Sequence, residues 1–91
     1  MSGIVAVIVK IMPSSPDTNL EEIKKKCTEL MESEGAKNIS FKEEAIAFGL
    51  KAIMMKMAWI EEKSSEIIES SLEKIENVSS VQIVDYRRAF G

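Results

Sequence analysis

Few side chains in this chain of 91 residues could do covalent chemistry. It holds no histidine, a single cysteine and no glycine-rich phosphate loop. Histidine is the side chain that titrates nearest neutral pH and the commonest zinc ligand, so its absence argues against most acid-base and zinc chemistry. Cys27 lies at helical spacing from Ile23 and Leu30, which predicts a small buried core residue rather than a nucleophile. We expect no catalytic residue, no metal site and no cofactor.

A predicted hairpin tip carries the first group of candidate binding residues. Phe48 and Gly49 lie between two stretches of strand-forming residues, and glycine can adopt the positive φ of a tight connection. An exposed phenyl ring in such a tip can anchor a partner, because it buries a large area and loses little rotamer freedom. The alternative is that Phe48 folds back onto the core of its own domain.

The basic and aromatic end of the chain, Asp85–Gly91, is the second candidate binding segment. It holds Arg87 and Arg88, although terminal segments of this kind are more often plain surface. A third cationic group is Lys24-Lys25-Lys26. It has acidic residues at helical pairing distance, so we interpret it as an exposed, ion-paired helix face.

Charge and hydropathy narrow the class of partner. The 12 basic and 15 acidic side chains give a net charge of −3, so we expect no direct nucleic-acid partner. No apolar run reaches the roughly 18 residues of a membrane span, and the chain begins without a secretory signal. The single cysteine cannot close an internal disulfide. We therefore expect a cytoplasmic protein with no membrane partner, and a monomer in the absence of its own partner.

The hydropathy pattern predicts the elements that must position these residues. Strands are predicted at 4–12, 38–47, 50–60 and 79–87, and amphipathic helices from about 20 to 35 and from about 64 to 77. Asn19 is the predicted cap of the first helix, Gly35 its stop, and Ser64 the cap of the second. Glu43 and Glu44 interrupt the alternation of the second strand, which predicts a bulged edge strand.

The order strand, helix, strand, strand, helix, strand predicts an α+β, ferredoxin-like βαββαβ sandwich. This fold has a four-stranded antiparallel sheet with two helices on one face. Right-handed crossovers place the first and third strands at the centre, and these two strands are the most apolar. Because a chain this short holds one core, we expect a single domain over residues 1–91.

Three blocks of sequence together resemble the archaeal-type elongation factor 1-beta family, and the resemblance spans essentially the whole chain. The blocks are Ile46-Ala47-Phe48-Gly49-Leu50, Asp85-Tyr86-Arg87-Arg88 and Met12-Pro13-Ser14-Ser15-Pro16-Asp17. The resemblance implies the same order of strands and helices. It also implies a nucleotide exchange factor for the GTPase elongation factor 1-alpha, which promotes exchange of GDP for GTP without covalent chemistry of its own.

The resemblance also implies which residues act. In eukaryotic relatives, an aromatic residue flanked by glycines inserts from this hairpin into the GTPase, and a lysine near the carboxyl terminus reaches the magnesium and switch region. Phe48 matches the aromatic residue, with Ala47 and Gly49 beside it. The position of the lysine falls at Arg88, with Arg87 as the near alternative. By this resemblance, both the hairpin and the basic carboxyl-terminal segment would act near the nucleotide and magnesium site.

The competing interpretation is a ferredoxin-like regulatory module that binds RNA or a small ligand. RNA-binding sheets of this fold stack bases on aromatic residues of their central strands. Here the central strands hold one aromatic residue, Trp59, which shares a face with Ile53, Met55 and Met57 and is predicted to face the helices. The sequence contains no identifiable ligand motif for this alternative.

Overall fold

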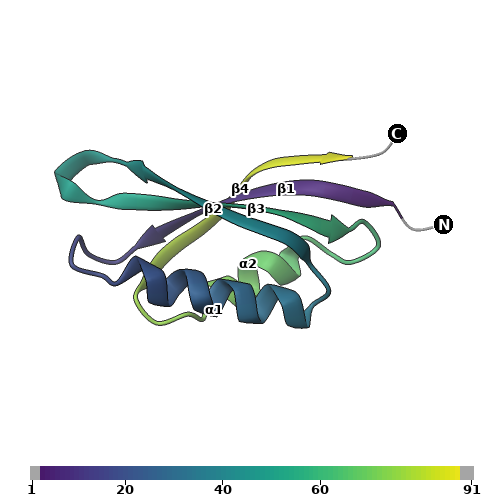
Figure 1. The fold of residues 1–91 in the computed structure, drawn as a ribbon, viewed down its shortest axis with the longest axis horizontal. Coiled ribbons are helices and arrows are strands. Elements are labelled where there is room, and N and C mark those ends of the chain that lie inside the picture. The colour runs from purple at the N-terminus through teal and green to yellow at the C-terminus, as the bar shows by residue number, and fades with distance from the viewer. Residues whose placement is uncertain (1–2, 89–91) are drawn as a thin grey trace.

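The computed structural model describes residues 3–88 of the chain. In chain order, its elements are β1 (Ile4–Pro13), α1 (Leu20–Ser33), β2 (Lys37–Ala45), β3 (Lys51–Ile60), α2 (Glu66–Leu72) and β4 (Val78–Arg88). The strands form one antiparallel sheet in the order β2-β3-β1-β4, and both helices lie on one face of it (Figure 1). The predicted ferredoxin-like fold, with the first and third strands at its centre, is confirmed, and every predicted strand boundary agrees within two residues.

The core lies between the helices and the odd-numbered residues of β1 and β3. The register pairs Val7 with Met57, and residues directly opposite each other in antiparallel strands point to the same face. Trp59 is 1% exposed in this core, and its Nε1 donates a hydrogen bond to the Lys63 carbonyl oxygen at 3.1 Å. Its position facing the helices is as predicted. The strand and helix residues of the core include Val5, Val7, Val9, Ile11, Ile23, Cys27, Met31, Ile53, Met55, Met57, Trp59, Ile68 and Leu72.

Helix α1 begins and ends where its capping residues predict. The Asn19 Oδ1 atom accepts hydrogen bonds from the backbone N–H groups of Glu21 at 3.0 Å and Glu22 at 3.4 Å, which satisfies two donors of the first helical turn. The helix ends at Ser33, and Gly35 follows with a φ of 96°. Glycine tolerates this left-handed conformation, so Gly35 ends the helix as expected.

Helix α2 is shorter than the sequence predicts. It ends at Leu72, whereas the apolar spacing predicts a helix up to about Asn77. Beyond Leu72 the backbone forms a tighter turn than an α-helix. The Ile75 N–H group donates to the Leu72 carbonyl oxygen at 3.1 Å, and this three-residue separation is typical of a 3₁₀ turn. Asn77 then adopts a φ of 70°, which asparagine tolerates better than most residues. Ile75 still packs in the core, but from a turn instead of a helix.

Strand β2 is the bulged edge strand that the sequence predicts, but its bulge lies elsewhere. The register with β3 shifts between Lys37 and Ser40, where Asn38 has a φ of 56°. From Ser40 onward the pairing with β3 continues unbroken through Glu43 and Glu44. The break in hydropathy alternation at these two acids therefore reflects their surroundings and not a change of backbone register.

The thiol of Cys27 is fully buried in the core, as predicted from its helical spacing. Burial raises its pKa to about 12, because the charged thiolate would lose its hydration. We expect a disulfide reagent such as Ellman's reagent to label native Cys27 roughly a thousandfold more slowly than the urea-unfolded chain, since labelling requires opening of the core. Rapid labelling of the folded protein would contradict this placement.

Candidate functional site

The hairpin tip between β2 and β3 presents Phe48 to solvent. The Ile46 N–H group donates to the Leu50 carbonyl oxygen at 2.8 Å, and the Leu50 N–H group donates to the Ala47 carbonyl oxygen at 3.2 Å. These two hydrogen bonds close a short 3₁₀ turn over Ala47–Gly49. Phe48 is 93% exposed in this turn, so the alternative in which its ring folds back onto the core is wrong.

The backbone of the tip is strained at Phe48 itself. Phe48 has a φ of 61° and a ψ of 31°, and Gly49 follows with a φ of 76°. The left-handed conformation costs a residue with a side chain roughly 1–2 kcal/mol, whereas glycine adopts it freely. A bulky residue that is both strained and solvent-exposed contributes little to the stability of its own fold. Such strain is concentrated at binding and active sites, which supports a role for Phe48 toward a partner.

The loop after β1 lies beside the hairpin tip. A Cβ atom placed on Gly49 would lie 3.9 Å from the Cβ atom of Pro16. A cleft of about 180 Å³ separates the loop from the base of the hairpin, with Pro16, Thr18 and Gly49 among its walls. The structure thus brings together two of the three sequence blocks that carry the family resemblance, namely residues 46–50 and residues 12–17.

The two arginines at the end of β4 point to opposite faces of the sheet. Arg87 pairs with Ala6, and Arg88 pairs with Val5, a core residue on the face that the helices cover. Because side chains alternate along a strand, Arg87 lies on the open face. The two alternatives left by the sequence therefore occupy different surfaces of the molecule.

Each arginine has an acidic partner within the chain. Arg88 donates from Nε and Nη2 to the two carboxylate oxygens of Glu61, at 2.5 and 2.7 Å. Arg87 donates from Nε to Asp85 Oδ1 at 3.1 Å. The hydrogen bonds and charge of Arg88 hold the pKa of the Glu61 carboxyl below its usual value, and Glu61 raises the pKa of Arg88 in return.

The pair between Arg88 and Glu61 is accessible to a partner. The Arg88 side chain is 65% exposed and that of Glu61 is 30% exposed. Water competes for both groups at such a surface, so the net stabilisation from the pair is small. Arg88 can therefore exchange Glu61 for an anionic group of a partner at little cost. Sequence reasoning missed Glu61, because 27 residues separate it from Arg88 and only the sheet topology brings the ends of β3 and β4 to the same end of the sheet, on either side of β1.

The structure does not bring Phe48 and Arg88 together. The hairpin tip precedes β3 and Arg88 lies beside the far end of that strand, so the two residues occupy opposite ends of the sheet (Figure 1). The ten residues of β3 alone span about 30 Å. The molecule is elongated accordingly, with extents of 44 × 21 × 19 Å. A partner that contacts both ends must therefore do so across this length, and the expectation that both segments act near the nucleotide and magnesium site stays a prediction.

The three lysines Lys24–Lys26 of α1 form only in part the exposed helix face that the sequence predicts. Lys24 binds Glu21 at 3.0 Å and also Glu43 of β2 at 2.7 Å, so it links the helix to the edge strand. The hydrogen bond from Lys24 is the main reason why the pKa of Glu43 falls below its usual value. Lys25 and Lys26 are exposed, as expected. Contact with Lys24 gives the Glu43 carboxylate a partner on the helix side of the strand.

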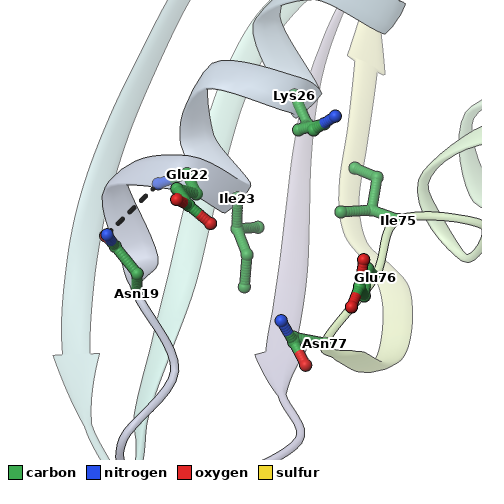
Figure 2. Close-up of a pocket in the computed structure, with 7 residues that line it drawn as sticks. All are labelled: Asn19, Glu22, Ile23, Lys26, Ile75, Glu76 and Asn77. Carbon is green, nitrogen blue, oxygen red and sulfur yellow. Dashed lines mark hydrogen bonds between the residues drawn. The ribbon is translucent and has the colours of Figure 1, made fainter.

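Hollows on the helix side of the molecule differ in size, and the one between α1 and α2 measures about 730 Å³. Figure 2 shows the pocket between the start of α1 and the turn before β4, where Ile23 and Ile75 lie near Lys26, Glu22 and Glu76. Its volume of about 120 Å³ is well below the roughly 300 Å³ at which small-molecule sites begin. Within residues 3–88, no three histidine, cysteine or acidic side chains cluster so as to hold a metal ion. None of the helices in that same range is long and apolar enough to span a bilayer.

Comparison with known proteins places almost the whole chain in one family. The model of the EF-1 guanine nucleotide exchange domain matches residues 6–89. The chain is 41% identical over 87 residues to elongation factor 1-beta of Methanothermobacter thermautotrophicus, an alignment that covers 94% of this chain and 97% of the relative. It is 38% identical over 87 residues to elongation factor 1-beta of Methanosarcina barkeri, covering 94% and 98%. For elongation factor 1-beta of Methanocaldococcus jannaschii, the identity is 38% over 78 residues, covering 85% and 88%.

Proposed function

Because the chain belongs to the EF-1 guanine nucleotide exchange domain family, we propose that it promotes exchange of GDP for GTP on the GTPase elongation factor 1-alpha. It would act in the cytoplasm as a translation elongation factor. The observation that carries the proposal is the family match over nearly the full chain. The exposed, strained Phe48 at a closed hairpin tip supports it, because nothing in the fold of the chain itself requires that side chain there.

We propose that the two ends of the molecule contact different parts of the GTPase. Arg88, with its exposed guanidinium group, acts at the nucleotide and magnesium site, where a cation can disturb the binding of the metal ion. Phe48, with Ala47 and Gly49 beside it, anchors the hairpin tip in a second place on the same GTPase. The length of β3 between the two contacts supports this division.

Nucleotide exchange in this proposal follows from two linked binding equilibria of the GTPase, one with its nucleotide and one with the exchange domain. The exchange domain binds the empty GTPase more tightly than the nucleotide-bound form. By linkage, the presence of the exchange domain weakens nucleotide binding by the same ratio of affinities. A 10⁴-fold difference in affinity corresponds to about 5.5 kcal/mol. A buried aromatic anchor and a displaced metal contact can share a coupling of that size, since single hot-spot residues contribute about 2 kcal/mol or more.

Two measurements on the full chain test the proposed function. Purified protein is first mixed with immobilised elongation factor 1-alpha to measure binding, and then added to the GTPase loaded with fluorescent GDP to measure release. We expect binding together with faster GDP release in the presence of excess unlabelled GTP. Binding without faster release would indicate a scaffold, and the absence of both would favour the regulatory module as the alternative.

Lys25→Ala provides the matched control for the cationic side chains. Lys25 is exposed on α1 and has no ion pair within the part of the chain that the structure describes. We expect its removal to change the rate of GDP release less than about twofold, as for a solvated surface charge. A large effect in the release assay would instead place the interface on the first helix.

A further inference from the structure

The ion pair between Glu61 and Arg88 joins two strands that are not neighbours in the sheet. Glu61 directly follows β3 and Arg88 ends β4, and β1 lies between these two strands. Two hydrogen bonds still link the side chains, from Nε and Nη2 of Arg88 to the carboxylate oxygens of Glu61, at 2.5 and 2.7 Å. The pair therefore spans the central strand β1 at one end of the sheet, and the chain at the start of β1 must leave room for it.

Gly3, directly before β1, leaves this room. The Glu61 N–H group donates to the Gly3 carbonyl oxygen at 3.0 Å, which fixes the backbone of Glu61 against that of Gly3. A Cβ atom placed on Gly3 would lie 3.2 Å from Glu61 Oε1 and 3.5 Å from its Cδ atom. The first of these distances is tighter than the 3.4–4 Å of an ordinary contact. The Glu61 carboxylate thus lies against the space that a side chain at position 3 would fill.

This arrangement fixes the orientation of the Arg88 guanidinium group. Two parallel hydrogen bonds between a planar guanidinium group and a planar carboxylate set both the position and the plane of the arginine side chain. Glu61 is itself held, because its backbone is bonded to Gly3 and its side chain is 30% exposed. Arg87 has no comparable support: it makes one hydrogen bond to Asp85, and its side chain is 79% exposed.

The guanidinium group keeps donors for a partner while Glu61 holds it. Arginine has five N–H donors on three nitrogen atoms. Glu61 accepts hydrogen bonds from Nε and Nη2, and within residues 3–88 no hydrogen bond involves Nη1 of Arg88. The Arg88 side chain is 65% exposed. Glu61 can therefore stay bound to Arg88 while Nη1 meets another group.

We propose that Glu61 is a positioning residue for Arg88 in nucleotide exchange, and that Gly3 permits this role by leaving the space in which the carboxylate lies. The inference rests on the proposed function, because it assumes that Arg88 acts at the nucleotide and magnesium site. A free arginine side chain samples many rotamers and loses this freedom when it acts at one point. Glu61 restricts the freedom of Arg88 before the GTPase binds, so less of it is lost during exchange.

Glu61→Gln and Glu62→Gln are a matched pair of variants, because each removes one negative charge. Glu62 is exposed, and within residues 3–88 it forms no ion pair. We expect Glu61→Gln to lower the kcat of stimulated GDP release about threefold, since exposed ion pairs have modest effects. Its KM for elongation factor 1-alpha should change less than about twofold. Glu62→Gln should leave both parameters at their wild-type values.

A double-mutant cycle shows whether Glu61 acts through Arg88. In the Arg88→Ala background, Glu61→Gln should have no further effect on kcat, because the group that it positions is gone. Gly3→Ala should lie between wild type and Glu61→Gln, because its Cβ atom presses on the carboxylate without removing it. Thermal unfolding of each variant shows that the fold is kept.

The order of the two arginine side chains can be measured in the absence of the GTPase. Arg87 and Arg88 are the two arginines of the chain. NMR relaxation of their Nε–H groups therefore reports the motion of each on the picosecond to nanosecond timescale. We expect Arg88 to be more ordered than Arg87 in the wild-type protein. Arg88 should lose this order in Glu61→Gln, with Arg87 unchanged.

Several outcomes would overturn the inference. Faster GDP release in Glu61→Gln than in wild type would show that Glu61 competes with the GTPase for Arg88. The same loss of kcat with and without Arg88, or a loss of backbone amide order along β4 in Glu61→Gln, would show that the pair only holds the end of the sheet together. Equal order of the two arginines in wild type would show that Glu61 does not hold Arg88.

Failure of the inference is distinguishable from failure of the proposed function. If wild type stimulates release and Arg88→Ala slows it, but Glu61→Gln does not, the positioning role alone is wrong. If Arg88→Ala releases GDP at the wild-type rate, the role of Arg88 is wrong, and that of Glu61 with it. If wild type does not stimulate release at all, the proposed function itself is wrong.

Discussion

Phe48→Ala is expected to slow stimulated GDP release at least about tenfold, with no loss of stability. Aromatic anchors that become buried in a partner contribute about 2 kcal/mol or more, and 1.4 kcal/mol corresponds to a factor of ten. The ring is 93% exposed in the free protein, so its removal leaves no cavity in the core. Release of fluorescent GDP measures the first effect, and unfolding in urea measures the second.

Two further substitutions separate the ring from the backbone strain beneath it. Phe48→Gly relieves the left-handed conformation and should be roughly 0.5 kcal/mol more stable than Phe48→Ala, after allowance for the greater flexibility of unfolded glycine. It should be as slow in exchange as the alanine variant. Phe48→Tyr keeps an aromatic ring and should retain most of the activity. Exchange at the wild-type rate in Phe48→Ala would remove the proposed anchor.

Hydropathy patterns predicted the parts of this fold that burial controls. The two central strands are apolar on both faces, and they are central in the sheet. The cap at Asn19 and the stop at Gly35 were readable because each depends on the chemistry of a single residue next to its own helix. The end of α2 was misread because Ile75 packs in the core equally well from a turn, so apolar spacing alone could not distinguish a turn from a helix.

The sheet topology was predictable from the sequence, but a residue pattern shows neither the distances between the site residues nor the backbone conformation of the hairpin tip. The sequence identified Phe48 and Arg88 separately, but their separation follows from the antiparallel path of β3 and β4 on either side of β1. The same path brings Glu61 to Arg88. The strain at Phe48 was equally hidden, because Gly49 alone would account for a tight turn and phenylalanine is a poor residue for a positive φ.

Arg88→Ala is expected to lower the rate of stimulated GDP release about tenfold. Arg87→Ala should change this rate less than about threefold, because a smaller effect is typical of a charge at the rim of an interface. The two side chains point to opposite faces, so they cannot substitute for each other at one site. Arg88→Lys should retain most of the activity, because it keeps a positive charge at the position where the family resemblance places a lysine. The same GDP-release assay compares all three variants, each at a concentration that saturates the GTPase. A larger effect from Arg87 than from Arg88 would assign the magnesium-site role to the open face.

The double variant Phe48→Ala, Arg88→Ala distinguishes two separate contacts from one shared pocket. Effects of substitutions more than about 10 Å apart, with no shared contacts, usually add in free energy. The length of β3 places these residues about 30 Å apart. We therefore expect the loss in kcat/KM for the GTPase to equal the product of the two single losses within about a factor of two. If the double variant loses no more kcat/KM than the more affected single variant, both residues act in one place. The length of the sheet would then require a large rearrangement on binding.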